Sequence, residues 1–372
     1  MQCRRPIQRE RSDDIASVYA VLLNAAPLCC AATRGRDLPS DLNMRCRATM
    51  VRTVARMSLS VVVTIALCVR GRTVSNDNSL VFEKVSLRGM GALVLTGPSS
   101  CGKGHVASAL GEVLSIPSDR HLSMGEILRE TVTRAKTEPE FAAQLSARCQ
   151  IGAATNILES ADASDDLLAK IRQHGDELAS FFQRSDMHRF TSQLDWLEFC
   201  VTRGLLVPNR WTHALVEAKI DRVLETSDAP LILDGYPRTV QAAEHLIAYL
   251  TKRNVPVVKV FHLSISKQEM LSRAVNRGRR DDELKALLSR YEFYVEKVQP
   301  SVDYMKHVLP ANTIALIDAH QAVYDELDGE RVLNLSRSVA NVVASALLNL
   351  GAPRGVVRDL LEHHMGAVPT NV

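Results

Sequence analysis

The sequence lacks several features that would assign it to familiar classes of protein. Its eight cysteines include no C-x-x-C pair, and the chain has no internal repeat and no low-complexity tract. These absences argue against a zinc site, a disulfide framework and a repeat protein. No nucleic-acid-binding motif is visible, so we expect no nucleic-acid partner. The apolar stretch 57–69 holds only 13 residues, which is too short to cross a bilayer comfortably, so we expect no stable membrane span.

The first 89 residues differ from the rest of the chain in charge and in cysteine content. They hold 14 of the 45 lysines and arginines, only 7 of the 42 acids, and five of the eight cysteines. The formal net charge of +3 therefore belongs to this segment alone. We predict that residues 1–89 are an extension that is disordered or not native, and Met90 is one candidate start of translation. The cysteine usage indicates a reducing compartment, so we expect a cytoplasmic protein, with organelle targeting by this segment left open.

Residues 97–104, Gly-Pro-Ser-Ser-Cys-Gly-Lys-Gly, have the pattern of a phosphate-binding loop. An apolar run at 92–96 precedes them, and a helical pattern that begins near Val106 follows. In such a strand–loop–helix unit, backbone N–H groups and the positive end of the helix dipole converge on one point. Lys103 adds a full positive charge there. We therefore predict that the loop binds the phosphates of a nucleoside triphosphate.

A second predicted strand, 230–234, ends at a carboxylate and is followed by Gly235-Tyr236-Pro237-Arg238. Ligands collect outside the carboxyl ends of parallel strands, so we expect Asp234 and Arg238 in the crevice that holds Lys103. A carboxylate there can hold Mg²⁺ or its waters, and an arginine can bind phosphate through two parallel hydrogen bonds.

A dense group of arginines follows later in the chain. Phosphoryl transfer between two anions requires several cations around one crevice, because negative charge must be stabilised where water is excluded. The candidates for this role are Arg273, Arg277, Arg279, Arg280 and Arg290.

Five motifs, spread over roughly 200 residues, resemble the adenylate kinases and related nucleoside monophosphate kinases in kind and in order. They are the loop 97–104, the segments 121–129, 204–208 and 234–239, and Arg279-Arg280-Asp281-Asp282 with Arg290. The resemblance covers about residues 90–350. It implies a P-loop NTPase-type α/β fold, in which a parallel sheet carries helices on both faces.

The resemblance also implies roles for individual residues. The triphosphate donor would be cradled by Gly97, Ser99, Ser100, Cys101, Gly102, Lys103, Gly104 and His105, with Arg273 stacking on its base. The acceptor would be bound by Ser123, Met124, Arg129, Val207, Gly235, Arg238 and Gln241. The catalytic cations would be Lys103, Arg238, Arg277, Arg279 and Arg290, with Asp281 and Asp282 anchoring lid closure and Asp234 orienting Mg²⁺ through water.

Several positions depart from the pattern of the family. His105 replaces a hydroxyl residue, Ser100 replaces a common glycine, and Met124 replaces a threonine. Gln241 lies one place before the position of the glutamine that reads the acceptor base, so adenine, cytosine and uracil acceptors all stay open. Only Gly278 separates two arginines between which the family has a lid.

The acceptor side is enlarged, with 74 residues between Arg129 and Gly204. Apolar residues recur at near-helical spacing in 167–182 and 194–201, which predicts an added helical subdomain at about 130–203. We interpret its apolar stripe as the core of the insertion itself. A further hypothesis is that the insertion folds over the site and replaces the lid.

The coarse pattern predicts alternating strands and helices, which is typical of a parallel sheet covered on both faces. Strands are expected at 92–96, 119–122, 230–234, 256–263 and 313–318. Helices are expected at 104–115, 125–135, 209–225, 238–251, 267–277, 281–307 and 331–350. Residues 351–372 are expected to be a tail.

Together these features predict a monomeric nucleoside monophosphate kinase that binds small-molecule nucleotides. It would transfer the γ-phosphoryl group of MgATP to a nucleoside monophosphate, with AMP as the favoured acceptor, giving two nucleoside diphosphates. Two alternatives stay open at this point. One is a degenerate nucleotide-binding sensor or scaffold without turnover, and the other is a P-loop kinase for a different small metabolite.

Overall fold

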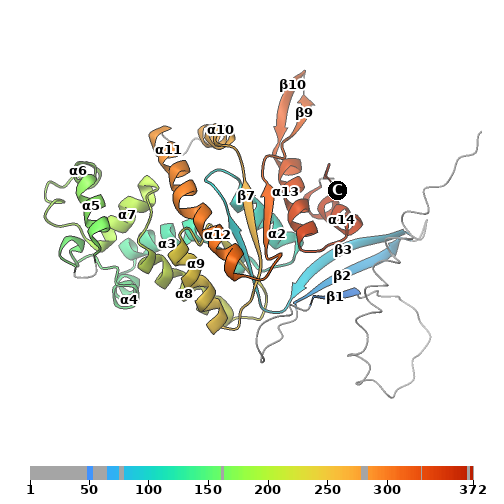
Figure 1. The fold of residues 1–372 in the computed structure, drawn as a ribbon, viewed down its shortest axis with the longest axis horizontal. Coiled ribbons are helices and arrows are strands. Elements are labelled where there is room, and N and C mark those ends of the chain that lie inside the picture. Colours follow the sequence, from blue (N-terminus) through green and yellow to red (C-terminus); the bar gives the residue numbers. More distant parts are fainter. Residues whose placement is uncertain are drawn as a thin grey trace, which may run out of the picture.

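The computed structural model describes residues 48–52, 65–74, 79–160, 163–277, 284–327, 329–366 and 369–371. A parallel sheet of five strands lies at its centre, in the order β5-β6-β4-β7-β8 (Figure 1). The strands are β4 (Ala92–Thr96), β5 (His121–Ser123), β6 (Leu231–Asp234), β7 (Val257–Ser264) and β8 (Ile314–Asp318). These are the five predicted strands, each shifted by at most two residues, so the parallel α/β fold is confirmed.

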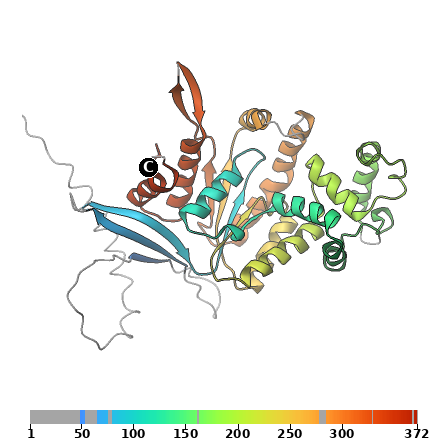
Figure 2. The same cartoon turned by 180° about the vertical axis from the view of Figure 1, so that it is seen from behind.

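The central strand β4 is buried on both faces, because helices cover the sheet on each side. Side chains alternate along a strand, so Leu93 and Leu95 enter one core and Ala92 and Val94 enter the other. The first core is completed by α2 (Lys103–Val113), α13 (Leu335–Asn349) and α14 (Arg354–Met365). The second is completed by α3 (Met124–Thr137), α8 (Asn209–Leu224), α9 (Val240–Lys252) and α12 (Gln299–Val308). Figures 1 and 2 show the two helical layers from opposite sides.

The register of the sheet brings the carboxyl ends of the central strands to one edge. Asp234 at the end of β6 lies opposite Leu95 of β4 on one side and opposite Ser123 of β5 on the other. On the far side of β4, Thr96 lies opposite His262 of β7. Because all these strands run in one direction, the loop after β4 and the carboxylate of β6 share an edge.

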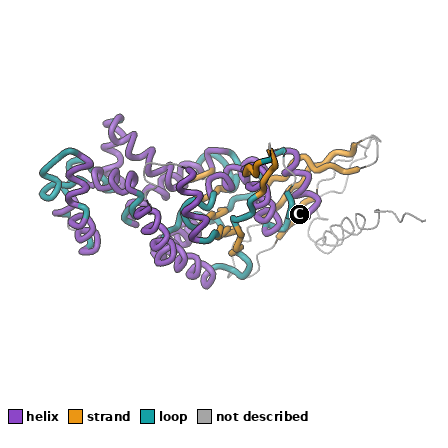
Figure 3. Tube along the Cα trace, turned by 90° about the horizontal axis from the view of Figure 1, so that it is seen from above, coloured by secondary structure: helices purple, strands orange, loops and turns teal. Residues whose placement is uncertain are grey.

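The insertion between α3 and α8 consists of helices. They are α4 (Pro139–Cys149), α5 (Asp165–Gln173), α6 (Gly175–Phe182) and α7 (Gln193–Arg203). Ser192 and Asp195 form a reciprocal capping box that fixes the start of α7. The buried Trp196 and Leu178 belong to the same hydrophobic core as α3 and α8. The insertion is therefore packed on the main fold, and Figure 3 shows it at the opposite end from the antiparallel strands β2 and β3.

Two predicted helices differ in the structure. The helix expected over 281–307 is divided into α11 (Leu284–Phe293), a π-helical turn (Tyr294–Val298) and α12. The helix expected from residue 331 begins at Leu335, because a hairpin of β9 (Val323–Leu327) and β10 (Glu330–Asn334) precedes it. Asn334 sets this boundary, since its side chain accepts a hydrogen bond from the Arg337 N–H and caps α13. The helix predicted at 267–277 is α10 (Lys267–Arg277).

Both ends of the described chain hold more structure than predicted. Residues 351–372, expected to be a tail, contain α14, whose Val356, Val357, Leu360 and Leu361 are buried. That spacing is helical, and the helix packs against α13 and α2. In the segment expected to be disordered, the described parts are strands: β1 (Ala48–Arg52), β2 (Ile65–Val74) and β3 (Ser79–Arg88) form an antiparallel sheet. That residues 1–89 are an extension that is disordered or not native stays a prediction.

None of the helices that the structure describes is both long and apolar enough to cross a bilayer.

Arg120 supports the edge of the sheet from within. Its guanidinium is fully buried and donates hydrogen bonds to the carbonyl oxygens of Val223, Ser227 and Ala229, which connect α8 to β6. Burial lowers the pKa of Arg120, and nearby Asp119 and Asp228 oppose that shift. The side chain thus joins the end of α8 to the segment that leads into β6.

We predict that Arg120→Met destabilises the protein by about 3 kcal/mol, because the carbonyl oxygens of Ser227 and Ala229 lose a charged donor and hydrogen bonds to charged groups contribute about 1.5–3 kcal/mol each. Urea unfolding measures the change. Arg134→Met is the matched control, since the exposed ion pairs of Arg134 with Glu130 and Glu138 and its contact with the Phe141 ring are expected to contribute little. Equal midpoints for the two variants would contradict the structural role of Arg120.

Candidate nucleotide-binding cleft

The loop between β4 and α2 has the backbone geometry of a phosphate cradle. Gly97 and Gly102 have φ angles of 145° and 88°, a region that favours glycine. A Cβ at Gly97 would also overlap the carbonyl oxygen of Leu263 on β7. Gly102 caps α2, so the first N–H groups of this helix point into the loop. The loop therefore surrounds the positive end of a buried helix, as the sequence predicts.

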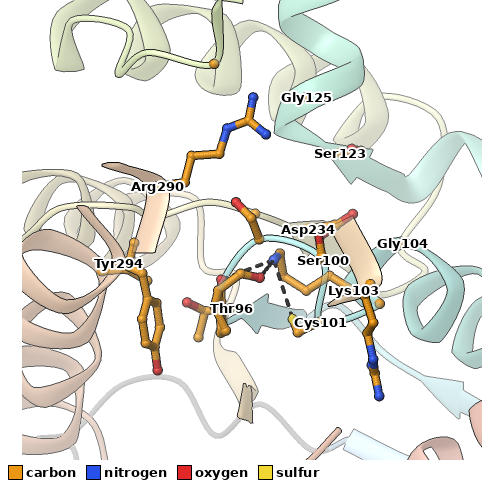
Figure 4. A pocket seen from close by; sticks show the side chains of 18 of the residues that line it. Thr96, Ser100, Cys101, Lys103, Gly104, Ser123, Gly125, Asp234, Arg290 and Tyr294 are labelled. Carbon is orange, nitrogen blue, oxygen red and sulfur yellow. Dashed lines mark hydrogen bonds between the residues drawn. The ribbon is translucent and has the colours of Figure 1, made fainter. Parts of the chain in front are cut away.

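Lys103 closes over this loop (Figure 4). Its Nζ donates to the carbonyl oxygens of Gly97 at 3.1 Å and Pro98 at 2.7 Å, and it lies 3.6 Å from Cys101 Sγ. Cys101 is buried, which suits a small loop residue. His105, by contrast, is exposed on the first turn of α2. The ammonium group is thus held at the mouth of the loop, while the imidazole of His105 lies at its rim.

Ser100 adopts the backbone conformation usual for glycine, with φ of 59°. Its hydroxyl is buried and has no hydrogen-bond partner. A serine costs free energy at this position if φ is positive, and φ is positive in the structure. Left-handed backbone costs an L-residue about 1–2 kcal/mol.

Asp234 lies at the carboxyl end of β6, beside the loop, and is only 8% exposed. Its Oδ2 is 3.8 Å from His121 Nε2 and 3.8 Å from the position that a Cβ on Gly104 would take. One carboxylate beside a phosphate cradle fits Mg²⁺, which usually binds one or two carboxylates, substrate phosphates and water. Among the described residues no cluster of three or more His, Cys, Asp or Glu could hold a metal by itself. Asp234 is therefore the residue that would hold Mg²⁺, through water.

Three arginines from separate segments line the same cleft as Lys103. Arg238 donates from Nε to the Gly235 carbonyl at 2.8 Å. Burial lowers the pKa of Arg238, Asp234 raises it, and the charge of Arg290 lowers it further. A guanidinium is not deprotonated in proteins, so Arg238 carries its positive charge. Arg129 lies over Gly125, where a Cβ would come within 3.2 Å of its Nη1.

Arg290 extends from α11 to the turn after α7. Its guanidinium lies against Gly204, and a Cβ at that position would overlap it. Gly204 has φ of 69° and caps α7, so glycine is required there both for the turn and for the approach of Arg290. Figure 4 shows Arg290 projecting into the cleft from the side opposite Lys103, with Asp234 between them.

The predicted lid is described only in part. Arg273 lies on α10, where its Nε donates to Glu269 Oε1 at 2.5 Å and its Nη2 to the Ala319 carbonyl at 3.1 Å. Arg277 is the last residue of α10. Arg279, Asp281 and Asp282 lie outside the described residues, so their predicted roles stay predictions.

The acceptor end of the cleft contains the remaining predicted residues. Ser123, Gly235 and Val207 line it, and Met124 and Val207 also line a small adjoining cavity beneath Arg238. Gln241 is on the surface, and its Oε1 accepts a hydrogen bond of 2.8 Å from Asn209 Nδ2. Asn209 also accepts from the Thr239 hydroxyl at 3.1 Å.

Sequence reasoning missed several residues at the cleft. Asn209 directly follows the 204–208 motif, which was the one available signal. Tyr294 lies in the π-helical turn, and its hydroxyl is 2.9 Å from His262 Nε2 behind the loop. Burial raises the pKa of Tyr294 to about 12 and lowers that of His262 to about 4. From the insertion, Lys170, His174 and Arg203 also line the cleft.

The cleft has a volume of about 2460 Å³. Single-ligand pockets usually measure about 300–1,000 Å³, so this space can hold two nucleotides.

A parallel sheet with a phosphate-binding loop after its central strand defines a P-loop α/β protein.

Comparisons with known proteins agree with this class and narrow it. Residues 179–309 match the family model described as adenylate kinase. The chain is 28% identical over 214 residues to an adenylate kinase of Mycobacterium sp. (strain MCS), covering 58% of this chain and 85% of that protein. It is 26% identical to an adenylate kinase of Corynebacterium urealyticum, covering 63% and 93%. Over a shorter stretch it is 38% identical to that of Mycolicibacterium vanbaalenii, covering 27% and 55%. These matches confirm the resemblance of this chain to the adenylate kinase family.

Among solved structures, the chain is similar to a gluconokinase from Sinorhizobium meliloti 1021. The identity is 13%, the TM-score is 0.34, and the match covers 71% of this chain and 93% of that one.

We predict that Ser100→Gly stabilises the protein by about 0.5–1 kcal/mol. It relieves left-handed strain of about 1–2 kcal/mol, and this outweighs the extra chain entropy of glycine, about 0.5–1 kcal/mol. Thermal unfolding tests the sign of the change. Ser99→Gly is the control, because Ser99 has no positive φ and glycine there is expected to destabilise. A lower melting temperature for Ser100→Gly would show that the position does not store strain.

Proposed function

We propose that this protein transfers the γ-phosphoryl group of MgATP to a nucleoside monophosphate, with AMP as the favoured acceptor, giving two nucleoside diphosphates. The observation that carries the proposal is the convergence of Lys103, Arg129, Arg238 and Arg290 on one cleft around Asp234. These residues come from four separate segments of the chain. The similarity of the chain to adenylate kinases supports the same reaction.

The loop end of the cleft is proposed to bind the donor. Backbone N–H groups of the loop and the start of α2 face the polyphosphate, and Lys103 offsets its negative charge. When Lys103 turns toward phosphate, it exchanges two carbonyl oxygens for anionic ones, which form stronger hydrogen bonds. His105 has no hydroxyl to offer, so its imidazole is proposed to contact the phosphates from the rim. Mg²⁺, oriented by Asp234 through water, would offset charge between the phosphates of the donor.

The opposite end is proposed to bind the acceptor. Arg129 and Arg238 would hold the monophosphate, while Met124, Val207 and the cavity beneath Arg238 face its base. Gln241 is held by Asn209, so the amide pair, rather than Gln241 alone, is positioned near this end. A base with both donor and acceptor groups on one edge fits such an amide pair, and adenine is one such base.

Arg290 and Arg238 are proposed to stabilise the phosphoryl group in transfer. Phosphoryl transfer needs little covalent chemistry from the protein, so positioning and charge supply most of the rate enhancement. Burial is the main cause of the lowered pKa of Arg238, and the charge of Arg290 lowers it further. An anion placed between the two guanidinium groups would offset their like charges. On the roles that the family resemblance implies, Arg277 and Arg279 would join Arg238 and Arg290 around the transferred phosphoryl group.

Several wider assignments belong to the same proposal. We assign residues 90–350 to the kinase domain and about 130–203 to an insertion that covers the acceptor end in place of a lid. The three cysteines Cys101, Cys149 and Cys200 are buried free thiols, which fits a cytoplasmic location. We assign the protein as a monomer.

We predict that Lys103→Met lowers turnover by about 100–1,000-fold, because it removes a charge that acts on the transferred group. Arg238→Ala is expected to have an effect of the same order. A coupled assay measures ADP formation with AMP, CMP, UMP, GMP and dAMP as acceptors. Lys136→Met, on the outer side of α3, is the control with unchanged turnover. Near-normal rates in Lys103→Met would refute the donor site, and turnover with none of the five acceptors would refute the reaction.

Gly204 and Gly366 offer a matched pair of substitutions. Both residues cap a helix in left-handed conformation, with φ of 69° and 58°. Alanine costs about 1 kcal/mol of backbone strain at each. A Cβ at Gly366 meets nothing within 4 Å, whereas one at Gly204 displaces Arg290.

We predict that Gly204→Ala lowers kcat by at least about tenfold, while Gly366→Ala leaves it unchanged at a similar cost in stability. Loss of one charge–charge interaction of about 1.4 kcal/mol in the transition state corresponds to that factor. Steady-state kinetics and urea unfolding of both variants provide the measurement. Equal losses of kcat in Gly204→Ala and Gly366→Ala would mean that backbone strain alone, and not the position of Arg290, accounts for the effect.

A further inference from the structure

The cleft continues beyond the phosphate loop to the β9–β10 hairpin. It passes along the outer face of α2, where His105, Ser108 and Glu112 line it. At its end it is lined by Tyr324, Arg331, Leu333 and Leu335. The hairpin projects from the first core beside α10 (Figures 1 and 2). No role considered so far uses the residues of the hairpin.

One face of the hairpin presents an aromatic ring and a cation to the cleft. Tyr324 pairs with Leu333 across the strands, and the two side chains are 47% and 49% exposed. The Arg331 guanidinium lies over the Tyr324 ring, 4.9 Å from its centroid. Because side chains alternate along a strand, Asp325 and Val332, which also pair with one another, lie on the opposite face.

The opposite face holds the hairpin in place. Asp325 accepts hydrogen bonds from Asn334 Nδ2 at 2.6 Å and from Arg337 Nη1 at 3.0 Å, both near the start of α13. The N–H of Val323 donates to the Ser338 hydroxyl at 2.9 Å. The exposed aromatic face is therefore fixed relative to α13.

Helix α10 also lines this end of the cleft. Its residues there are Glu269, Ser272, Arg273 and Asn276. Arg273 is held by Glu269 and by the Ala319 carbonyl, and Glu269 also lies 3.6 Å from His320 Nε2. These contacts connect α10 to the segment that leads into the hairpin.

We propose that Tyr324 and Arg331 bind the nucleobase of the donor nucleotide. The inference rests on the proposed binding of a nucleoside triphosphate at the phosphate loop. The phosphates at the loop direct the nucleoside along α2 toward the hairpin, where the base stacks on the Tyr324–Arg331 face opposite α10. Aromatic and guanidinium planes stack on any base, so this face adds affinity for the nucleoside with little discrimination among bases. It also covers the donor end, where the lid arginines are separated by Gly278 alone.

The test compares a ligand that has a base with one that has none. Isothermal titration measures the binding of ATP and of inorganic tripolyphosphate to the full-length chain and to Tyr324→Ala, Arg331→Ala and Val332→Ala. Stacking of one base on an aromatic residue predicts that Tyr324→Ala weakens ATP binding about tenfold. We expect a smaller loss of ATP affinity in Arg331→Ala and unchanged tripolyphosphate binding in Tyr324→Ala. We expect wild-type affinities for Val332→Ala, because Val332 lies on the opposite face of the hairpin, with Asp325.

The outcomes separate this inference from the proposed reaction. ATP binding that is unchanged in Tyr324→Ala, or weakened equally for ATP and tripolyphosphate, would overturn the base site while leaving the reaction intact. A wild-type protein that binds ATP but does not phosphorylate any monophosphate would overturn the reaction, and the titrations would still decide the base site. A wild-type protein that does not bind ATP would overturn both.

Discussion

The proposed function depends on the concentration of positive charge at one edge of a parallel sheet. A nucleoside triphosphate carries several negative charges, and only cations and oriented N–H groups brought together from distant segments can offset them outside bulk water. The parallel register provides this, because the loop after β4, Asp234 of β6 and Ser123 of β5 end at the same level. Buried leucines, valines and isoleucines of the two cores fix that register. The chemistry of the edge is thus a consequence of the packing beneath it.

The second constraint is the exclusion of water from this charged cleft. Electrostatic interactions weaken greatly in contact with solvent, so phosphoryl transfer needs a cover over the site. Only Gly278 separates Arg277 from Arg279, where the adenylate kinases that this chain resembles would carry a lid. Two other elements contribute residues to the cleft: the insertion α4–α7 and the β9–β10 hairpin. On the proposed function, these two elements cover the acceptor end and the donor end.

The sequence predicts the sheet well because its strands are short apolar runs bounded by turn residues. The loop residues and Asp234 could be found in the same way, since their spacing depends on local chain geometry. The hairpin could not be predicted, because its residues read as polar. Its strands are held by hydrogen bonds of Asp325 and Val323 with Arg337 and Ser338 of α13. The pairing of Asn209 with Gln241 joins residues 32 apart in sequence. Such contacts depend on how α8 and α9 pack, which periodicity does not specify.

The central claim is that donor and acceptor sites share one cleft and meet between Arg238 and Arg290. The most direct measurement is the binding of a compound in which two adenosines are joined by a chain of five phosphates, followed by isothermal titration and competition. The account predicts one molecule bound per chain, displaced by ATP and by AMP separately, with binding weakened in both Lys103→Met and Arg238→Ala. Two molecules per chain, or displacement by ATP but not by AMP, would show that the cations serve separate sites and would contradict the account.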